Sequence, residues 1–336
     1  AARDRSRADW LLGMNLSRFY TLREEAKGAR NLIVVGRVQT PTLTLVAQRD
    51  YAVRNFKPVP YLNILASCFG GGKVFQAKWK PGENQTGLDE EGRLIDLEFG
   101  KKLVVQLQSC REGEVISAET KLKRQAQPRC FSLADIQQAG SKAFGFTAEK
   151  TLSLCQSLYE KHKCISYPRT DCQFLPVSQH ADAPKVIAAI AKTIPGAEGI
   201  CGKADPAIKS PVWNDGKVTA HHGIIPTGLA ADWRLSVDEQ KLYGLIAKRY
   251  LAQFFPAYEY ESTKILLRIG GETFEATGNI PKREGWKVLY KKQIEAERRE
   301  KEKARKEEGG ADDEQELPKL RAGDKVEVRE VKGVDA

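Results

Sequence analysis

Two spacings of hydrophobic residues divide the chain into helical and extended stretches. Near the N-terminus, apolar residues recur every three or four positions over residues 9–26 and again over 41–56, which predicts two helices. The turn between them, residues 36–40, enters the second helix, whose first backbone N–H groups are free to bind a phosphate. We therefore expect a helical pair with an anion-binding turn within residues 1–57.

Apolar and polar residues alternate instead in two blocks that lie far apart in the sequence, residues 58–127 and 256–336. A period of two is typical of strands with one buried face. The candidate strands are residues 61–66, 74–79, 113–122, 262–269, 273–277 and 324–330. Two β-rich blocks around a segment of another kind predict one β domain interrupted by an inserted domain.

The segment between these blocks, residues 128–255, has helical spacing. Ser132 and Asp135 have the spacing of a capping box, Thr147 can cap the start of the next helix, and a turn at Gly145 separates the two helices. The second of these helices has one apolar face, formed by Leu152, Cys155, Leu158 and Tyr159. A helix, a short glycine turn and a second helix outline a helix-turn-helix, although most such pairs in proteins are ordinary packing. A third helix begins at Ser236. The fold class predicted for the chain is therefore α+β, with several domains.

Charge adds a candidate partner. The chain of 336 residues has a formal net charge of +10. The stretch 291–316, with 8 basic and 10 acidic side chains, is a charged insertion that we expect to form a solvated helix and then to fade into disorder. The remaining residues therefore carry +12. An excess of this size suits a polyanion, since neutralised phosphates release counterions. It also suits a protein that is basic only for solubility, so charge alone leaves both readings open.

Composition narrows the cellular setting. No run of about 18 apolar residues is present, and the first residues lack the apolar core of a signal peptide, so we expect a cytoplasmic protein without a membrane span. The seven cysteines are widely spread and include no C-x-x-C pair. We interpret them as reduced thiols that mostly pack in the core.

Tyr167 is the candidate nucleophile. It lies in the stretch Ile-Ser-Tyr-Pro-Arg-Thr-Asp, residues 165–171, with Arg169 two positions on. In an extended segment both side chains project to the same face, so the guanidinium can reach a phosphate that the phenol attacks. A tyrosine hydroxyl ordinarily titrates near pH 10, so it needs such a cation to act on a phosphodiester. The alternative is a packed tyrosine beside a surface arginine.

Two further groups of polar residues accompany this stretch. His221 and His222 are adjacent, and a histidine beside a phosphodiester can donate a hydrogen bond or transfer a proton. Paired histidines are also common as packing residues. The second group lies in the predicted N-terminal helices and consists of Arg5, Asp9, Arg18, Arg37 and Gln39. Arg5 and Asp9, four apart, could also form only an ion pair within the helix.

These stretches together resemble the type IA DNA topoisomerases, and specifically their topoisomerase III branch. The resemblance is carried, in the family's order, by residues 5–18, 36–43, 144–152, 156–160, 165–171 and 220–227. It implies a torus in which a β-rich arch is interrupted by a helical, helix-turn-helix-containing tyrosine domain. On that map the chain consists of part of the helical base (domain IV) at 1–57, the arch (domain II) at 58–127 and 256–336, and the tyrosine domain (domain III) at 128–255.

The resemblance also implies an activity. Tyr167 is expected to form a 5′-phosphotyrosyl bond to single-stranded DNA, with Arg169 and His221 at the cleaved phosphate. Another strand then passes through the gap, and the free 3′-hydroxyl religates the break without ATP. The residues expected to bind DNA are Arg5, Asp9, Arg18, Arg37, Gln39 and Thr170.

The family's Mg²⁺ ligands lie in a Toprim domain that precedes the part matched here. We therefore expect no metal site within this chain, and expect the chain alone to bind DNA without relaxing it. The resemblance further implies a monomer associated with the nucleoid, acting on negatively supercoiled or catenated DNA.

Two alternatives belong to other classes. The HUH relaxases also form a 5′-phosphotyrosine, but they need a His-hydrophobic-His metal motif, whereas His221 and His222 are adjacent. A single-strand DNA-binding module without independent catalysis would equally account for the basic charge and the aromatic residues.

Overall fold

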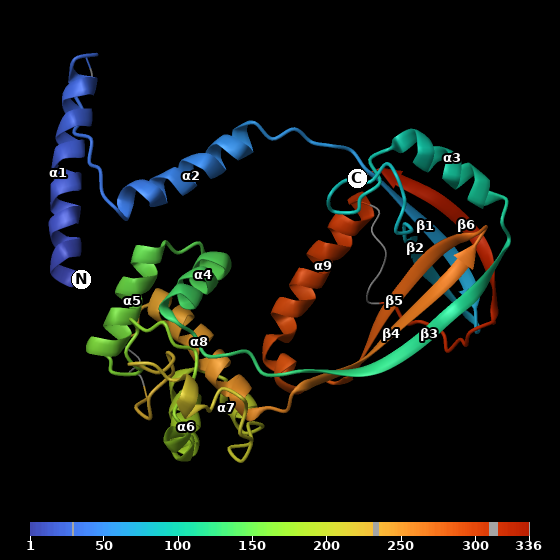
Figure 1. Ribbon diagram of the computed structural model, residues 1–336. Coiled ribbons are helices and arrows are strands. Elements are labelled where there is room, and N and C mark those ends of the chain that lie inside the picture. The colour runs from blue at the N-terminus through green and yellow to red at the C-terminus, as the bar shows by residue number, and fades with distance from the viewer. Residues whose placement is uncertain (29, 231–234, 309–314, 336) are drawn as a thin grey trace. The chain divides into compact units, whose positions relative to one another are not determined.

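The computed structural model describes residues 1–28, 30–230, 235–308 and 315–335 (Figure 1). Within these ranges the chain forms two units, Ala1–Pro60 and Tyr61–Ala336. No helix in the described ranges combines the length and the apolar character that crossing a membrane requires.

The N-terminal unit contains the two predicted helices, α1 (Ala2–Glu25) and α2 (Gln39–Arg54). Two hydroxyl groups on successive turns of α1 hold the connecting segment. Ser17 Oγ accepts a hydrogen bond from the backbone N–H of Val35 at 2.9 Å, and Thr21 Oγ1 accepts one from Ile33 at 3.0 Å. Because each hydroxyl satisfies a backbone group of an irregular segment, residues 33–35 run alongside α1.

Six antiparallel strands of the second unit close into a barrel in the order β1-β2-β5-β4-β3-β6 (Figure 1). They are β1 (Leu62–Gly70), β2 (Lys73–Trp79), β3 (Glu112–Gln125), β4 (Tyr258–Ile269), β5 (Glu272–Arg283) and β6 (Lys325–Asp335). All six predicted strands are confirmed, although each extends further than its pattern indicated. Three strands from each β block close into one barrel, and the alternation of apolar and polar residues did not predict this closure.

The barrel interior is filled by side chains that alternate inward along the strands. On β1 the inward residues include Ile64, Ala66 and Cys68, and on β4 they include Ile265 and Leu267, all of them buried. Closing the sheet removes its free edges, since β1 pairs with β6 and β3 pairs with both β4 and β6.

A helix that the sequence reading missed, α3 (Leu97–Gln108), packs against β1 and β6 of the barrel. Asp96 caps it by accepting a hydrogen bond from the N–H of Phe99 at 3.0 Å. A Cβ at Gly100 would lie 2.5 Å from Leu62, so this glycine allows the close approach of α3 to β1. Leu103 and Leu107 complete the buried face of the helix.

The segment between β3 and β4 is helical, as its spacing predicted. Its helices are α4 (Leu133–Phe144), α5 (Ala148–Glu160), α6 (Ala183–Thr193), α7 (Glu198–Cys201) and α8 (Val237–Leu251), with short 3-10 turns η1 (Val177–Asp182), η2 (Asp215–Lys217) and η3 (Ala252–Phe254). Ser132 and Ser236 each form the predicted capping box, and Thr147 caps α5. Gly145 ends α4 with φ +68°, a left-handed conformation that favours glycine, so the helix-turn-helix outline is present.

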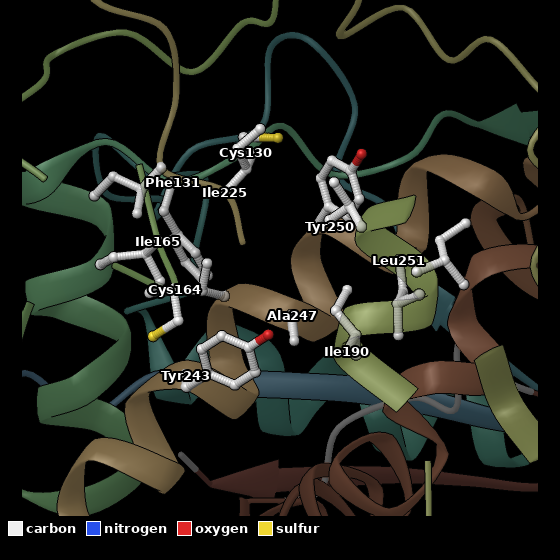
Figure 2. Packing of buried hydrophobic residues seen from close by; sticks show 14 of the residues in the cluster. Cys130, Phe131, Cys164, Ile165, Ile190, Ile225, Tyr243, Ala247, Tyr250 and Leu251 are labelled. Atoms are coloured by element: carbon white, nitrogen blue, oxygen red, sulfur yellow. The ribbon is translucent and has the colours of Figure 1, made fainter. Parts of the chain in front are cut away.

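This segment has its own hydrophobic core, separate from that of the barrel (Figure 2). Three non-helical stretches run through it, and isolated bridges join Ile165 to Pro226 and Phe131 to Ile224. Cys164 also lies in this core, where burial raises the pKa of its thiol to about 12. All seven cysteines are free thiols, six of them buried, which confirms their packing role.

A last turn, η4 (Gly285–Tyr290), leads from β5 into α9 (Lys291–Glu308). This helix confirms the helical part of the predicted charged insertion. The predicted fading into disorder falls on residues 309–314, outside the residues that the structure describes.

Candidate active site around Tyr167

Two segments far apart in the sequence are held together beside Tyr167 by the hydroxyl group of Ser166. Its Oγ accepts a hydrogen bond from the N–H of Ile225 at 3.0 Å and donates one to the carbonyl oxygen of Gly223 at 3.2 Å. The N–H of Ser166 also donates to the carbonyl oxygen of Ile225 at 2.8 Å. Three bonds through one residue fix the register between the stretch that carries Tyr167 and the stretch that carries His221.

Thr170 makes a second link on the other side of Tyr167. Its side chain is 4% exposed, and its hydroxyl donates to the carbonyl oxygen of His221 at 3.3 Å while accepting from the N–H of Cys172 at 3.0 Å. Thr170 was predicted to bind DNA. In this structure its buried hydroxyl instead holds the two segments together, so a direct contact with DNA would require it to be uncovered.

The Tyr167 ring lies against two other rings. Its centroid is 4.6 Å from that of His221, with the ring planes tilted by 46°, and 5.6 Å from that of Tyr159, in an edge-to-face arrangement at 76°. His221 comes from the segment bonded to Ser166, whereas Tyr159 lies in the last turn of α5. The structure therefore brings Tyr167 and His221 together, as expected, and adds Tyr159, which the sequence reading placed only on the packing face of its helix.

Arg169 is exposed, and within the described ranges no hydrogen bond, ion pair or ring contact engages it. Exposure alternates from Tyr167 onward: Pro168 and Thr170 are buried, whereas Tyr167 is half-buried and Arg169 exposed. This alternation is typical of an extended segment and puts Tyr167 and Arg169 on the same side of it. The guanidinium is free to pair with an anion there, but it does not touch the Tyr167 ring.

The loop that follows Tyr167 gathers further positive charge. Phe174, whose carbonyl oxygen accepts from the N–H of Gly223 at 2.9 Å, has the guanidinium of Arg129 5.0 Å and the ammonium of Lys217 5.1 Å from its ring centroid. Both cations are exposed. Sequence reasoning missed them because Arg129 and Lys217 are 88 residues apart, and only their shared contact with Phe174 brings them together.

The predicted DNA-binding residues of the first helices belong to the unit Ala1–Pro60. Asp9 pairs with Arg37, Oδ1 to Nε at 2.7 Å, and not with Arg5, so the ion pair within α1 that the spacing allowed is wrong. Arg5, Arg18 and Gln39 are exposed. At about 100° per residue Arg18 lies roughly 220° around α1 from Arg5, so these two arginines do not share a face.

In the described ranges no three His, Cys, Asp or Glu side chains lie close enough together to hold a metal ion. The residues around Tyr167 therefore do not fit a magnesium site. What they offer a phosphate is a phenol, an imidazole and the exposed cations of Arg129, Arg169 and Lys217.

Comparison with known proteins identifies the family. Residues 1–335 match the family described as DNA topoisomerase. The chain is 43% identical over 299 residues to a DNA topoisomerase 3 from Vibrio cholerae, covering 87% of this chain and 46% of that protein, and 37% identical over 333 residues to a DNA topoisomerase 3 from Bacillus subtilis, covering 97% and 42%. The chain thus spans about half the length of the curated relatives it matches.

A solved structure has a similar fold. Full-length topoisomerase I from Thermotoga maritima superposes with a TM-score of 0.64 at 24% identity, covering 98% of this chain and 48% of that one. At this identity the likeness concerns the fold alone. The family match and the identities to DNA topoisomerase 3 confirm the predicted resemblance, and the chain belongs to the DNA topoisomerase family, on its type IA, topoisomerase III-like branch.

Proposed function

We propose that the protein containing this chain is a DNA topoisomerase that breaks one DNA strand with Tyr167 and reseals it. The observation that carries the proposal is the position of the Tyr167 ring, whose centroid lies 4.6 Å from that of the His221 ring and which is on the same side of its segment as the exposed guanidinium of Arg169. A nucleophile, a group that can move a proton and a cation are the components that attack on a phosphodiester needs.

The reaction conserves the energy of the phosphodiester bond that it breaks. The phenolic oxygen of Tyr167 attacks the phosphorus, the bond from phosphorus to the 3′-oxygen breaks, and a 5′-phosphotyrosine forms as the phenolic proton leaves and the 3′-oxygen gains one. After another strand has passed, the 3′-hydroxyl attacks the same phosphorus and releases Tyr167. Because the phosphotyrosine retains the energy of a phosphodiester, no ATP is required.

Each neighbour has a role in this scheme. Arg169 neutralises the non-bridging oxygens, where charge builds up in the transition state. His221 donates a hydrogen bond to the phosphate or transfers the proton. Ser166 and Thr170 act as positioning residues, because their hydroxyls join the two segments that carry these groups.

The domain map of the resemblance is part of the proposal. The strands form the arch of a torus at 58–127 and 256–336, the helical segment 128–255 is the domain that carries the tyrosine, and residues 1–57 belong to the base. Arg5, Asp9, Arg18, Arg37 and Gln39 then line the path of the strand. Mg²⁺ is proposed for the whole protein, but we assign it no ligand in this chain, and no step above depends on it.

The proposed substrates are single-stranded regions of negatively supercoiled or catenated DNA, met by a monomer in the cytoplasm in association with the nucleoid. The net charge of +12 outside residues 291–316 supports a DNA partner, because it lets several phosphates be neutralised at once.

The test is formation of the covalent adduct by the full-length protein. With single-stranded DNA labelled at its 3′ end, the unmodified protein should become labelled after denaturation, whereas Tyr167→Phe should form no adduct and Tyr260→Phe should behave as the unmodified protein. Arg169→Ala should slow cleavage about 100-fold, as removal of a transition-state charge partner does, while DNA affinity changes much less. An adduct formed by Tyr167→Phe would refute the assignment.

A single-strand DNA-binding module without catalysis is the second candidate. It is favoured by the same basic charge. That candidate would be supported if the full-length protein bound DNA in a salt-dependent way and yet formed no adduct with any substrate.

A further inference from the structure

The helical segment between β3 and β4 is joined covalently to the barrel at two adjacent points (Figure 1). The chain enters it after Gln125, the last residue of β3, and leaves it at Tyr258, the first residue of β4, and these two residues are paired in the sheet. At this end of β3 the side chains of residues 119–125 are exposed, so the strands form a thin ribbon there. Two neighbouring connections define an axis about which the helical segment can turn, and a third contact is needed to fix its angle.

The turn η4, which follows β5, makes this third contact. The indole and backbone N–H groups of Trp286 donate to the carbonyl oxygens of Gln125 at 3.3 Å and Pro256 at 2.9 Å, so one residue is bonded to both connecting strands. Gly285 allows the approach, because a Cβ at this position would clash with the carbonyl oxygen of Pro256. Leu289, near the end of the turn, packs against the core of the helical segment.

The helix α9 extends the contact outward to α4. Glu297 lies six residues after the start of α9, about 9 Å along the helix axis, and its Oε1 is 2.9 Å from Nζ of Lys142 in the last turn of α4. The two side chains are 41% and 75% exposed, so solvent screens the ion pair and its contribution to stability is small. The pair therefore holds α9 on the helical segment and yet can open easily.

The packing between α9 and the ribbon is loose. A cavity of about 500 Å³ lies between them, with Tyr258, Tyr260 and Pro281 on the strands and Lys291, Ile294 and Arg298 on α9 among its walls. Well-packed protein interiors contain few voids larger than a water molecule. The start of α9 is therefore not fixed by close packing on the strands, and it has room to shift relative to them.

We propose that η4 and the first two turns of α9, residues 285–298, form a brace that fixes the angle of the helical segment, with the ion pair between Lys142 and Glu297 as its latch. When the latch opens, the helical segment turns about the connecting strands while Trp286 stays bonded to them. The inference rests on the proposed function, because a strand can pass only if the DNA end held by Tyr167 moves away from the other end.

The latch can be tested without DNA. Spin labels on Lys78→Cys in β2 and Ser153→Cys in α5 report the distance between the barrel and the helical segment, in full-length protein whose accessible cysteines are replaced by serine. Glu297→Lys and Lys142→Glu each bring like charges together and should raise the ratio of unlatched to latched molecules about fivefold. The double variant restores the pair with its charges exchanged and should return to the unmodified ratio.

Arg299→Glu is the matched control for these variants. It also reverses a charge of α9, but it lies about 200° around the helix from Glu297, so the ratio should not change. A distribution of distances that is the same in the two single variants and the unmodified protein would overturn the proposal, as would a double variant that resembles the single ones.

A reversible tether tests the role of the latch in strand passage. Lys142→Cys and Glu297→Cys can be joined by a bis-methanethiosulfonate as long as the two side chains it replaces, and dithiothreitol releases it. The tethered protein should form the adduct with a short single strand at the normal rate but relax supercoiled DNA about tenfold more slowly, as expected when a conformational step is blocked. Gln293→Cys with Glu297→Cys holds the same tether within α9 and should relax DNA normally.

Normal relaxation by the protein tethered between α4 and α9 would overturn the proposal. A parallel loss of adduct formation would do so as well, because the tether would then act on the site of Tyr167 and not on the turning of the segment. If the unmodified full-length protein formed no adduct and relaxed no DNA, the proposed function would fail, while the spin-label distances would still decide whether the latch exists.

Discussion

The ring of Tyr167 lies against the rings of His221 and Tyr159, and these contacts restrict how its hydroxyl can approach a phosphate. Edge-to-face and tilted ring pairs at these distances contribute about 0.5–1.5 kcal/mol each beyond the area that they bury. That energy contributes little to the stability of the fold, but it is enough to restrict the orientation of the Tyr167 ring before DNA binds. A restricted nucleophile loses less entropy on reaching the transition state.

Tyr159 should therefore act as a positioning residue. Tyr159→Ala removes the edge-to-face contact and should slow cleavage by about tenfold with little change in DNA affinity, the expected effect of a misplaced nucleophile. Tyr159→Phe keeps the ring and should retain nearly the full rate. Single-turnover cleavage and equilibrium binding by the full-length protein measure the two quantities. If the phenylalanine variant were as slow as the alanine variant, the hydroxyl of Tyr159, which is on a residue 38% exposed, would be what matters.

Some residues of this site could be predicted from the sequence, and others could not. Tyr167 and His221 were predicted, and the contact between their rings agrees with their shared assignment. Tyr159 was missed because helical spacing assigned it to the packing face of α5, and periodicity does not tell which neighbour a residue at the end of that face meets. The hydrogen bonds of Ser166 could not be predicted either, since they join its hydroxyl to backbone groups 57 and 59 residues away in the sequence.

At the scale of elements, local signals predicted most of the helices and strands. Capping residues and helical spacing predicted α4, α5 and α8, and the alternation of apolar and polar residues predicted the strands. These signals could be read from the sequence because each of them acts within a few residues. α3 was missed, although Asp96 caps it and its face of Leu103, Val104 and Leu107 is regular. Closure of the barrel depends on pairs such as β1 with β6, more than 200 residues apart, and no local pattern encodes these.

The carboxylate of Glu239 lies at the junction of α5 and α8, which we expect to be sensitive to acid for this reason. This carboxylate is only 7% exposed, accepts hydrogen bonds from Ser157 Oγ at 2.6 Å and from the N–H of Ser236 at 2.7 Å, and lies 3.4 Å from His162 Nε2. Burial alone would raise its pKa, but the hydrogen bonds outweigh it and hold the pKa below the ordinary 4.5.

The consequence is a loss of stability in acid. A carboxyl whose pKa is lowered by folding stabilises the folded state fully above about pH 4.5, and this contribution disappears as the pH falls below 4.5 and through the lower folded-state pKa. Glu239→Gln should flatten the dependence of the melting temperature on pH in that window, at the expense of lower stability at pH 7. Thermal unfolding from pH 3 to pH 7 measures this. An unchanged slope in the variant would mean that another carboxyl controls acid unfolding.

At the scale of the whole molecule, the described residues of the second unit form two hydrophobic cores. One lies in the barrel and includes Phe274, and the other lies in the helical segment and includes Leu158, with both side chains 0% exposed. Both strands that border the helical segment, β3 and β4, belong to the barrel. Because the two cores share no side chains, each can lose its packing while the other keeps it.

We therefore expect two unfolding transitions that respond to different substitutions. Phe274→Ala should lower the barrel transition by about 3–5 kcal/mol, and Leu158→Ala should lower the helical one by about 2–5 kcal/mol, because each leaves a cavity in its own core. Hydrogen exchange followed by mass spectrometry assigns the transitions, with β4 amides reporting on the barrel and α8 amides on the helical segment. If either substitution raised exchange equally in β4 and α8, the two cores would unfold as one cooperative unit.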